Sequence, residues 1–145
     1  MEQIDLTTGS LNLSQLQNIF RIIPQEFDFI DEKDIIRWYS NNSERIFDRE
    51  PSALNKHVLD VHPSKSADRI IKLLDQMHNG TVNEQVMVIP AKGKQIQISF
   101  YAVKDENEKY LGCIEVTQDV SHLVGKTKLG HMADLIKKRF SKGSS

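Results

Sequence analysis

Two histidines and one carboxylate lie close together near the middle of the chain: His57, Asp60 and His62. Imidazole nitrogens and carboxylate oxygens are common ligands of zinc and iron, and a segment that turns back could bring these groups to one ion. Such a site usually needs three or more protein ligands, and Asp60 is the one obvious third ligand here. The pattern therefore argues against a dedicated mononuclear metal site.

His62 also begins the stretch His62-Pro63-Ser64-Lys65-Ser66, just before a helical pattern. A neutral imidazole can serve as the axial ligand of a haem iron, provided that an apolar pocket surrounds it. The same stretch also fits the start of a helix, because proline suits the first turn and serine can accept hydrogen bonds from the free N–H groups there. Both interpretations remain open, and the pattern favours the structural role for His62.

No enzyme motif accompanies these residues. The chain has no Gly-rich phosphate loop, no nucleophile elbow and no His-Glu-x-x-His spacing. The acidic pairs, such as Asp31-Glu32, fall in predicted turns, where charges are mostly solvated. We therefore predict that the chain is not an enzyme.

Composition limits the remaining classes of function. The 145 residues suit one domain, and a formal net charge of -1 gives no overall field to attract nucleic acid or an anionic membrane. The single cysteine, Cys113, excludes an internal disulfide and an all-cysteine metal site, which fits a reducing compartment. No apolar run is long enough to cross a bilayer. We predict a cytoplasmic protein with no nucleic-acid or membrane partner.

The periodicity of the sequence predicts the elements that must position any site. A short amphipathic helix is expected at residues 14–23 with Ser14 as its cap, followed by a hairpin of strands 26–31 and 35–40. Short helical pieces are expected at residues 43–48 and 51–59, and a longer helix at 64–79, closed by Gly80. Three strands at 82–90, 94–103 and 110–120 complete the pattern. This order predicts an α+β fold in which helices pack on one face of an antiparallel sheet.

Four stretches in this order resemble the PAS domain family. They are FDFIDEKDIIRWYS, SERIFDREP, HPSKSADRIIKLLD and YLGCIEVTQDVS, and the resemblance covers roughly residues 24–122. It is nearest to the PAS branch that occurs alone or with hemerythrin-like regions. The resemblance implies a five-stranded antiparallel sheet around a central pocket, a PAS domain at 24–122, an N-terminal flanking segment at 1–23 and a C-terminal helix and tail at 123–145.

The resemblance also implies a sensory or dimerisation module without catalytic activity. PAS domains bind haem, flavins or small metabolites, so the family does not fix the cofactor. The cysteine motif of the flavin photosensors is absent, since Cys113 lies in the last predicted strand. The alternative function is a haem-based redox or gas sensor with His62 as its axial ligand. An amphipathic basic helix at 122–140 favours a homodimer, because its apolar stripe needs a partner.

If the pocket is open, we expect its walls to come from the sheet and the long helix: Phe29, Trp38, Ile70, Leu74, Ile98, Phe100 and Ile114. Polar groups that could orient a small organic ligand are Tyr39, Ser99, Tyr101 and Thr117. The competing interpretation is that the apolar side chains close on one another and leave no cavity. The sequence does not choose between them.

Overall fold

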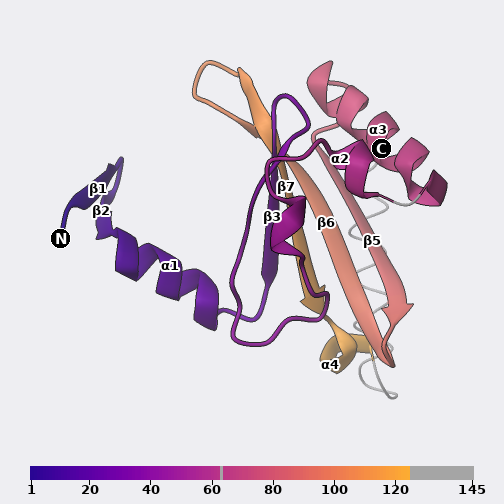
Figure 1. The fold of residues 1–145 in the computed structure, drawn as a ribbon, viewed down its shortest axis with the longest axis horizontal. Helices are drawn as coiled ribbons and strands as arrows, with labels where there is room; N and C mark the ends of the chain where they lie inside the picture. The colour runs from indigo at the N-terminus through magenta and orange to yellow at the C-terminus, as the bar shows by residue number, and fades with distance from the viewer. Residues whose placement is uncertain (63, 125–145) are drawn as a thin grey trace.

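The computed structural model describes residues 1–62 and 64–124, without the side chains of residues 64, 65 and 124. Figure 1 shows the order of the elements along the chain. They are β1 (Gln3–Leu6), β2 (Gly9–Asn12), α1 (Leu13–Ile22), β3 (Glu26–Asp31), β4 (Ile36–Tyr39), the 3-10 helix η1 (Pro51–Ala53), α2 (Val58–Val61), α3 (Ser64–His78), β5 (Glu84–Ala91), β6 (Lys94–Lys104), β7 (Tyr110–Asp119) and α4 (Ser121–Val124).

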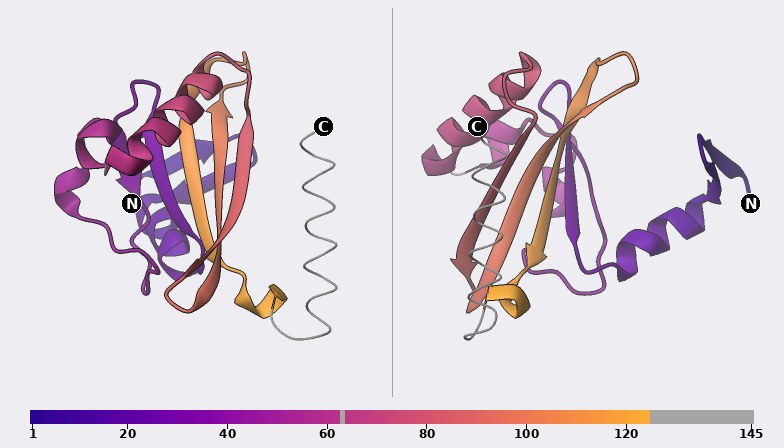
Figure 2. Two further views of the ribbon diagram at one scale, coloured as in Figure 1. Left: turned by 90° about the vertical axis from the view of Figure 1, so that its right-hand side faces the viewer. Right: turned by 180° about the vertical axis from the view of Figure 1, so that it is seen from behind.

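The main sheet has five strands in the order β4-β3-β7-β6-β5, and all neighbours are antiparallel. The predicted α+β class and five-stranded antiparallel sheet are confirmed. Helices α2 and α3 lie on one side of the sheet, whereas α1 and the small β1–β2 sheet project from the other (Figure 2). We call the side under α2 and α3 the inner face and the opposite side the outer face.

The predicted β3–β4 hairpin is held by one buried carboxylate. Oδ1 of Asp31 accepts hydrogen bonds from the backbone N–H groups of Lys33 (2.8 Å) and Ile35 (3.1 Å), and Oδ2 lies 2.6 Å from Nε of Arg37. Burial would raise the pKa of Asp31, but the bonds from Arg37 and the two N–H groups outweigh it and lower the pKa. The turn is completed by Asp34, whose φ is 63°.

Helix α1 begins two residues earlier than its predicted cap implies. Asn12, not Ser14, is the N-cap, because its side chain accepts from the N–H of Gln15 while the Gln15 side chain accepts from the N–H of Asn12, each at 2.9 Å. The helix ends at Ile22, before Pro24. The preceding hairpin, β1–β2, was not predicted, since its short strands are almost wholly exposed and carry no core pattern.

Helix α3 supplies one wall of the hydrophobic core. Leu73, Leu74 and Met77 are buried against the inner face of the sheet, and Gly80 (φ 79°) follows the helix as predicted. The remaining buried members of the core are Ile30, Val58, Phe100 and Cys113. Burial raises the pKa of Cys113 to about 12, so its thiol stays protonated and packs as an apolar group.

The segment between β4 and α3 contains less helix than predicted. Residues 43–48 form no helix, and within 51–62 there are only η1 and α2. The reason is a competing hydrogen bond: the N–H groups of Ile46 and Phe47 bond to the buried carboxylate of Glu26, at 2.6 and 3.2 Å. These groups are therefore not used in a helical ladder. The segment instead crosses the inner face of the sheet as an irregular cover.

Candidate ligand cavity

A cavity of about 470 Å³ lies between the inner face of the sheet and the irregular cover. Strands β3, β4 and β7 form its floor, and the chain from residue 49 to residue 62 forms its other wall. Its lining residues are Asp28, Ile30, Ile36, Tyr39, Arg49, Glu50, Ser52, Ala53, Val58, Val61, His62 and Glu115. The floor therefore combines apolar side chains with charged ones.

The register of β3 and β7 brings two carboxyl groups side by side on this floor. Asp28 lies opposite Glu115 in the β3–β7 ladder, and period-two alternation puts both on the same face as Ile30. Arg49, from the cover, forms a bidentate pair with Asp28: its Nε and Nη2 lie 2.7 and 3.1 Å from the two carboxylate oxygens. This pair ties the cover to the sheet.

A second arginine lies deeper, beside the cavity. Nη2 of Arg45 lies 3.5 Å from both Glu26 and Asp28, and its side chain is only 9% exposed. Its Nε donates to the carbonyl of Phe47, and its Nη1 donates to the carbonyl of Ser40. The two arginines and two carboxylates therefore form one buried network of compensating charges.

Glu115 has no direct contact with the charged groups of this network. Its carboxylate forms no ion pair or hydrogen bond with any residue that the structure describes. Burial, and then the charge of Asp28, raises the pKa of Glu115 to about 7, although Arg49 and Arg45 act in the opposite direction. Near neutral pH this side chain can therefore gain or lose a proton inside the cavity.

The two histidines found in the sequence have different positions. His57 is the N-cap of α2, and its Nδ1 accepts from the N–H of Leu59 at 3.2 Å. His62 is the C-cap of α2 and lines the cavity, with Nδ1 3.3 Å from Oγ of Ser66. Burial, together with the charge of Arg49, lowers the pKa of His62 and favours the neutral imidazole. Pro63, which the helix-start interpretation of His62 invoked, lies outside the described residues.

Among the residues that the structure describes, no group of three or more His, Cys, Asp and Glu side chains is arranged to hold a metal ion. In the same residues, no helix combines the length and the apolarity needed to span a membrane.

Comparison with known proteins identifies the fold family. A family model described as a PAS domain matches residues 16–121. The chain belongs to the PAS domain family. A comparison with curated proteins finds no match. The association with hemerythrin-like proteins and the division of the chain at residues 23 and 122 stay predictions.

Solved structures share this PAS fold. The C-terminal domain of a protein from Streptococcus mutans is 27% identical, with a TM-score of 0.77, and the match covers 82% of this chain and 92% of that one. A PAS domain from Colwellia psychrerythraea is 16% identical (TM-score 0.54; 76% and 98% covered). A sensory box sensor histidine kinase from Vibrio cholerae is 15% identical (TM-score 0.52; 73% and 89% covered). The fold is thus one found in signalling sensory domains.

The PAS sheet separates the residues that we expected to line one pocket. Ile98 and Phe100 lie on the inner face, in or against the core that includes Leu74 and Ile70 of α3. Phe29, Trp38 and Ile114 pair with one another on the outer face. The expectation of one shared wall was wrong. Both faces of β3 carry apolar residues, so the sequence of this strand does not reveal which face points inward.

The cavity is instead lined by charged residues that sequence analysis missed, chiefly Asp28, Glu115 and Arg49. The available signal was the alternation of Glu26, Asp28 and Ile30 in β3, but the two phenylalanines between them gave the stronger pattern. Of the predicted polar groups, Tyr39 lines the cavity, and the buried Thr117 shares its face. Ser99 and Tyr101 lie on the outer face, which follows from the β6–β7 register.

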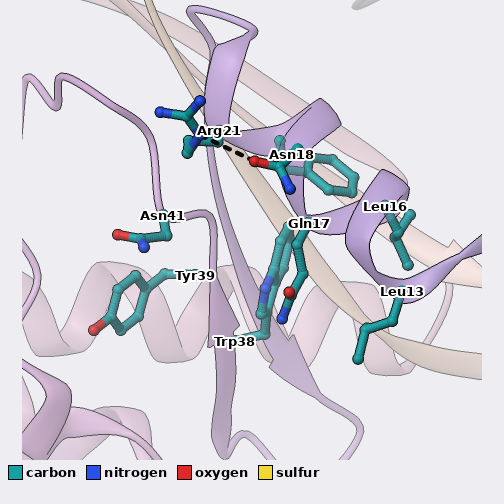
Figure 3. Close-up of a pocket in the computed structure, with 9 residues that line it drawn as sticks. Leu13, Leu16, Gln17, Asn18, Arg21, Trp38, Tyr39 and Asn41 are labelled. Carbon is teal, nitrogen blue, oxygen red and sulfur yellow. Dashed lines mark hydrogen bonds between the residues drawn. The ribbon is translucent and has the colours of Figure 1, made fainter. Parts of the chain in front are cut away.

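A groove of about 660 Å³ lies on the outer face, between α1 and β4. Figure 3 shows the residues that line it, with Arg21 donating to Asn18 on the helix (3.1 Å). The ring of Phe20 packs edge-on against Phe27 and Trp38, at centroid distances of 5.2 and 5.0 Å. This aromatic cluster explains why the apolar side chains of Phe27 and Trp38 can face outward, because α1 covers part of that face.

Proposed function

We propose that the chain is a non-catalytic sensory domain that binds a small molecule in the inner cavity. The observation that carries the proposal is the cavity itself, about 470 Å³ in volume, with an apolar wall and a few convergent polar groups. Membership of the PAS family supports a sensory role. A cytoplasmic location and a lack of nucleic-acid or membrane partners belong to the same proposal, and the single cysteine and the net charge of -1 support them.

The signal would pass through the cover of the cavity. Arg49 belongs to the cover and is bound to Asp28 of the sheet, so a ligand that competes with this pair or adds to it shifts the cover relative to β3. The cover contains little regular structure that would resist such a shift. A ligand-dependent position of residues 49–62 is the expected output.

Filling the cavity tests this function. Ala53 lines the cavity, and Ala53→Phe adds a ring that competes with a ligand for space. Val88, on β5, is 45% exposed, and Val88→Phe adds similar bulk away from the cavity. After incubation with a small-molecule cell extract, native mass spectrometry should detect a bound mass on the wild type and on Val88→Phe but not on Ala53→Phe. No bound mass on the wild type, or an equal mass on all three, would contradict the proposal.

The haem sensor remains a second candidate because His62 lines the cavity and its lowered pKa favours the neutral imidazole. The charged floor formed by Asp28 and Glu115 is a poor fit for an apolar macrocycle, so we rank this candidate below a small polar ligand. An absorption spectrum of protein purified with haem supplied would decide. A Soret band that His62→Ala abolishes would establish the haem candidate, and a band that is absent or unchanged in the variant would eliminate it.

We also propose that the domain forms a homodimer through α1. None of the ten residues of α1 is buried, and Ile19 and Ile22, three residues apart on one side of the helix, are 40% and 68% exposed. An isolated helix of this length is marginal in water, so its apolar face needs a cover. A second copy can supply the same face in a two-fold pairing. The C-terminal helix that first suggested a dimer lies outside the described residues.

The dimer is tested by charge on this face. Ile22→Glu should convert a dimer to a monomer in native mass spectrometry, because a carboxylate cannot be desolvated in an apolar contact. Gln17→Glu, at an exposed polar position of the same helix, is the matched control and should leave the dimer intact. A monomeric wild type, or a dimer that persists in Ile22→Glu, would contradict the proposal.

A further inference from the structure

We propose that the inner cavity selects small organic cations, and that the carboxylate of Glu115 is the group that binds their positive charge. This inference rests on the proposed function, since it takes the cavity to be a binding site and assigns the chemical class of its ligand. It follows from how the charges around the cavity are partnered.

The floor of the cavity and the groups beside it hold three carboxyl groups, Glu26, Asp28 and Glu115, and two guanidinium groups, whereas a fourth carboxyl group, Glu50, lies on the opposite wall and is exposed to solvent. Arg49 binds Asp28 through two nitrogens, and its Nη1 lies 3.4 Å from the carbonyl of Asp48. Arg45 lies between Glu26 and Asp28, and its other nitrogens bond to backbone carbonyls. Both cations are therefore committed to Glu26 and Asp28, and one carboxyl group is left over.

The third carboxyl group, Glu115, faces the cavity and forms no direct ion pair or hydrogen bond with a described residue, although the charges of Arg49 and Arg45 act on it from a distance. A half-buried carboxylate that no cation contacts directly is poorly compensated, so a proton or a bound cation stabilises it. A ligand with a protonated nitrogen supplies the missing charge and brings the sum over the five groups and the ligand to zero. No residue needs to leave its present partner for this to happen.

The same arrangement disfavours an anion. A negative group near Glu115 would also meet Asp28, directly opposite in the ladder. Nε and Nη2 of Arg49 are already bonded to Asp28, and Nη2 of Arg45, which has no hydrogen-bond partner among the described residues, lies 3.5 Å from both Glu26 and Asp28, which already offset its charge. The rest of the lining, including Ile30, Ile36 and Val58, is apolar. The ligand class is therefore a small apolar body that carries one protonated amine or protonated nitrogen heterocycle.

Three probes of similar size but different charge test this class: 2-phenylethylamine, 2-phenylethanol and 3-phenylpropanoate. Their affinities for the full chain are measured by isothermal titration calorimetry at pH 7.5. A charge-assisted hydrogen bond predicts that the amine binds at least about tenfold more tightly than the alcohol. The propanoate should bind most weakly.

Two variants assign the effect to Glu115. Glu115→Gln keeps the shape of the protonated side chain and should reduce the preference for the amine to less than about threefold. Glu84→Gln removes an exposed carboxylate on β5 and should leave the preference unchanged. Circular dichroism of each variant verifies the fold.

The pH dependence gives an independent readout. Below pH 7 a proton on Glu115 competes with the amine, so wild-type affinity for the amine should fall about tenfold from pH 7.5 to pH 6, whereas affinity for the alcohol should not. The other ionisable groups around Glu115 are Asp28 and Glu26 on β3, Tyr39 on β4, and Arg45, Arg49, Glu50 and His62 on the cover. The pKa of His62 is lowered by burial and by the charge of Arg49, and His62→Gln, which removes its imidazole, should retain the fall in affinity.

Equal affinities for amine and alcohol would overturn the cation proposal while leaving the cavity a binding site. An amine preference that survives in Glu115→Gln would overturn the role of Glu115. If none of the probes binds, the cation proposal is overturned, and the ligand mass found by native mass spectrometry still decides the proposed function separately.

Discussion

The inner face of the sheet has two halves that differ in what covers them. Helix α3 covers one half, where Leu74, Met77 and Phe100 close into a tight apolar core. The irregular cover lies over the other half, where its residues 49–62 leave a cavity with a charged floor. The same strands, β3 and β7, run through both halves, so the cover and not the sheet architecture sets the difference.

The contrast has a physical origin in backbone hydrogen bonding. A helix satisfies its own N–H and C=O groups, so α3 can present only apolar side chains to the sheet. An irregular segment does not, and its buried N–H groups need other acceptors. Glu26 provides them for Ile46 and Phe47, and its charge then requires Arg45. The charged half of the inner face is thus linked to the lack of helix above it.

Removing the acceptor should have the largest effect on the charged half. Glu26→Ala leaves two partly buried N–H groups and the buried guanidinium of Arg45 without their partner, and we expect a loss of about 3–5 kcal/mol in the free energy of unfolding. Urea denaturation measures it. Glu44→Ala, at an exposed carboxylate on the same segment, is the control and should change stability by less than about 0.5 kcal/mol. A loss below about 1 kcal/mol for Glu26→Ala would disprove this account of the charged half.

A truncation in the apolar half should cost somewhat less. Met77 is fully buried in the core, and Met77→Ala should lower the free energy of unfolding by about 3 kcal/mol, because it leaves a cavity. The loss should be independent of pH between 5 and 8, unlike effects in the charged half. Val88→Ala, at a side chain that is 45% exposed, serves as the control. A pH-dependent loss for Met77→Ala would contradict the claim that titrating charges act only in the charged half.

The charge of Glu115 should make stability depend on pH. Its native pKa of about 7 lies above its ordinary value of 4.5, so between these values the native state holds a proton that the unfolded chain has released. This contribution is fully present below pH 4.5 and is lost as pH rises through 7. We expect the wild type to lose about 2 kcal/mol relative to Glu115→Gln between pH 5 and pH 8.

Thermal or urea denaturation of the two proteins across this range measures the difference. His62 contributes to the pH dependence with the opposite sign, because its pKa is lowered, but this contribution cancels when the variant is compared with the wild type. Parallel stability curves for wild type and Glu115→Gln would show that Glu115 is not the titrating group.

The smallest expected effect concerns a buried hydroxyl between the two halves. Oγ1 of Thr117 is buried and has no hydrogen-bond partner among the described residues. Thr117→Val should therefore raise the free energy of unfolding by up to about 1 kcal/mol. Ser40→Ala is the opposite case, since Oγ of Ser40 accepts from the N–H of Phe27 at 2.9 Å, and it should lower stability by about 1 kcal/mol. A loss on Thr117→Val would indicate that the hydroxyl has a partner after all.

Much of the fold could be predicted because it depends on local patterns. The apolar stripe of α3 and the polar turn at residues 31–34 have direct signatures in the sequence, and the structure contains both. The candidate site was harder. In β3 we expected the face with Phe27 and Phe29 to point inward. Phe20 of α1 instead covers that face from the outer side, and Asp28 faces the cavity.

The amino-acid sequence by itself determined the number of strands in the main sheet, their order along the chain and the position of the long helix, because periodicity and turn chemistry act over a few residues. Only the tertiary structure decided which face of β3 points inward. It also brought Asp28 and Glu115 side by side on two strands that are distant in the sequence. The same tertiary contacts explain why residues 43–48 are not helical, since two of their N–H groups donate to Glu26. Each of these outcomes depends on a partner far along the chain, and no local pattern contains that partner.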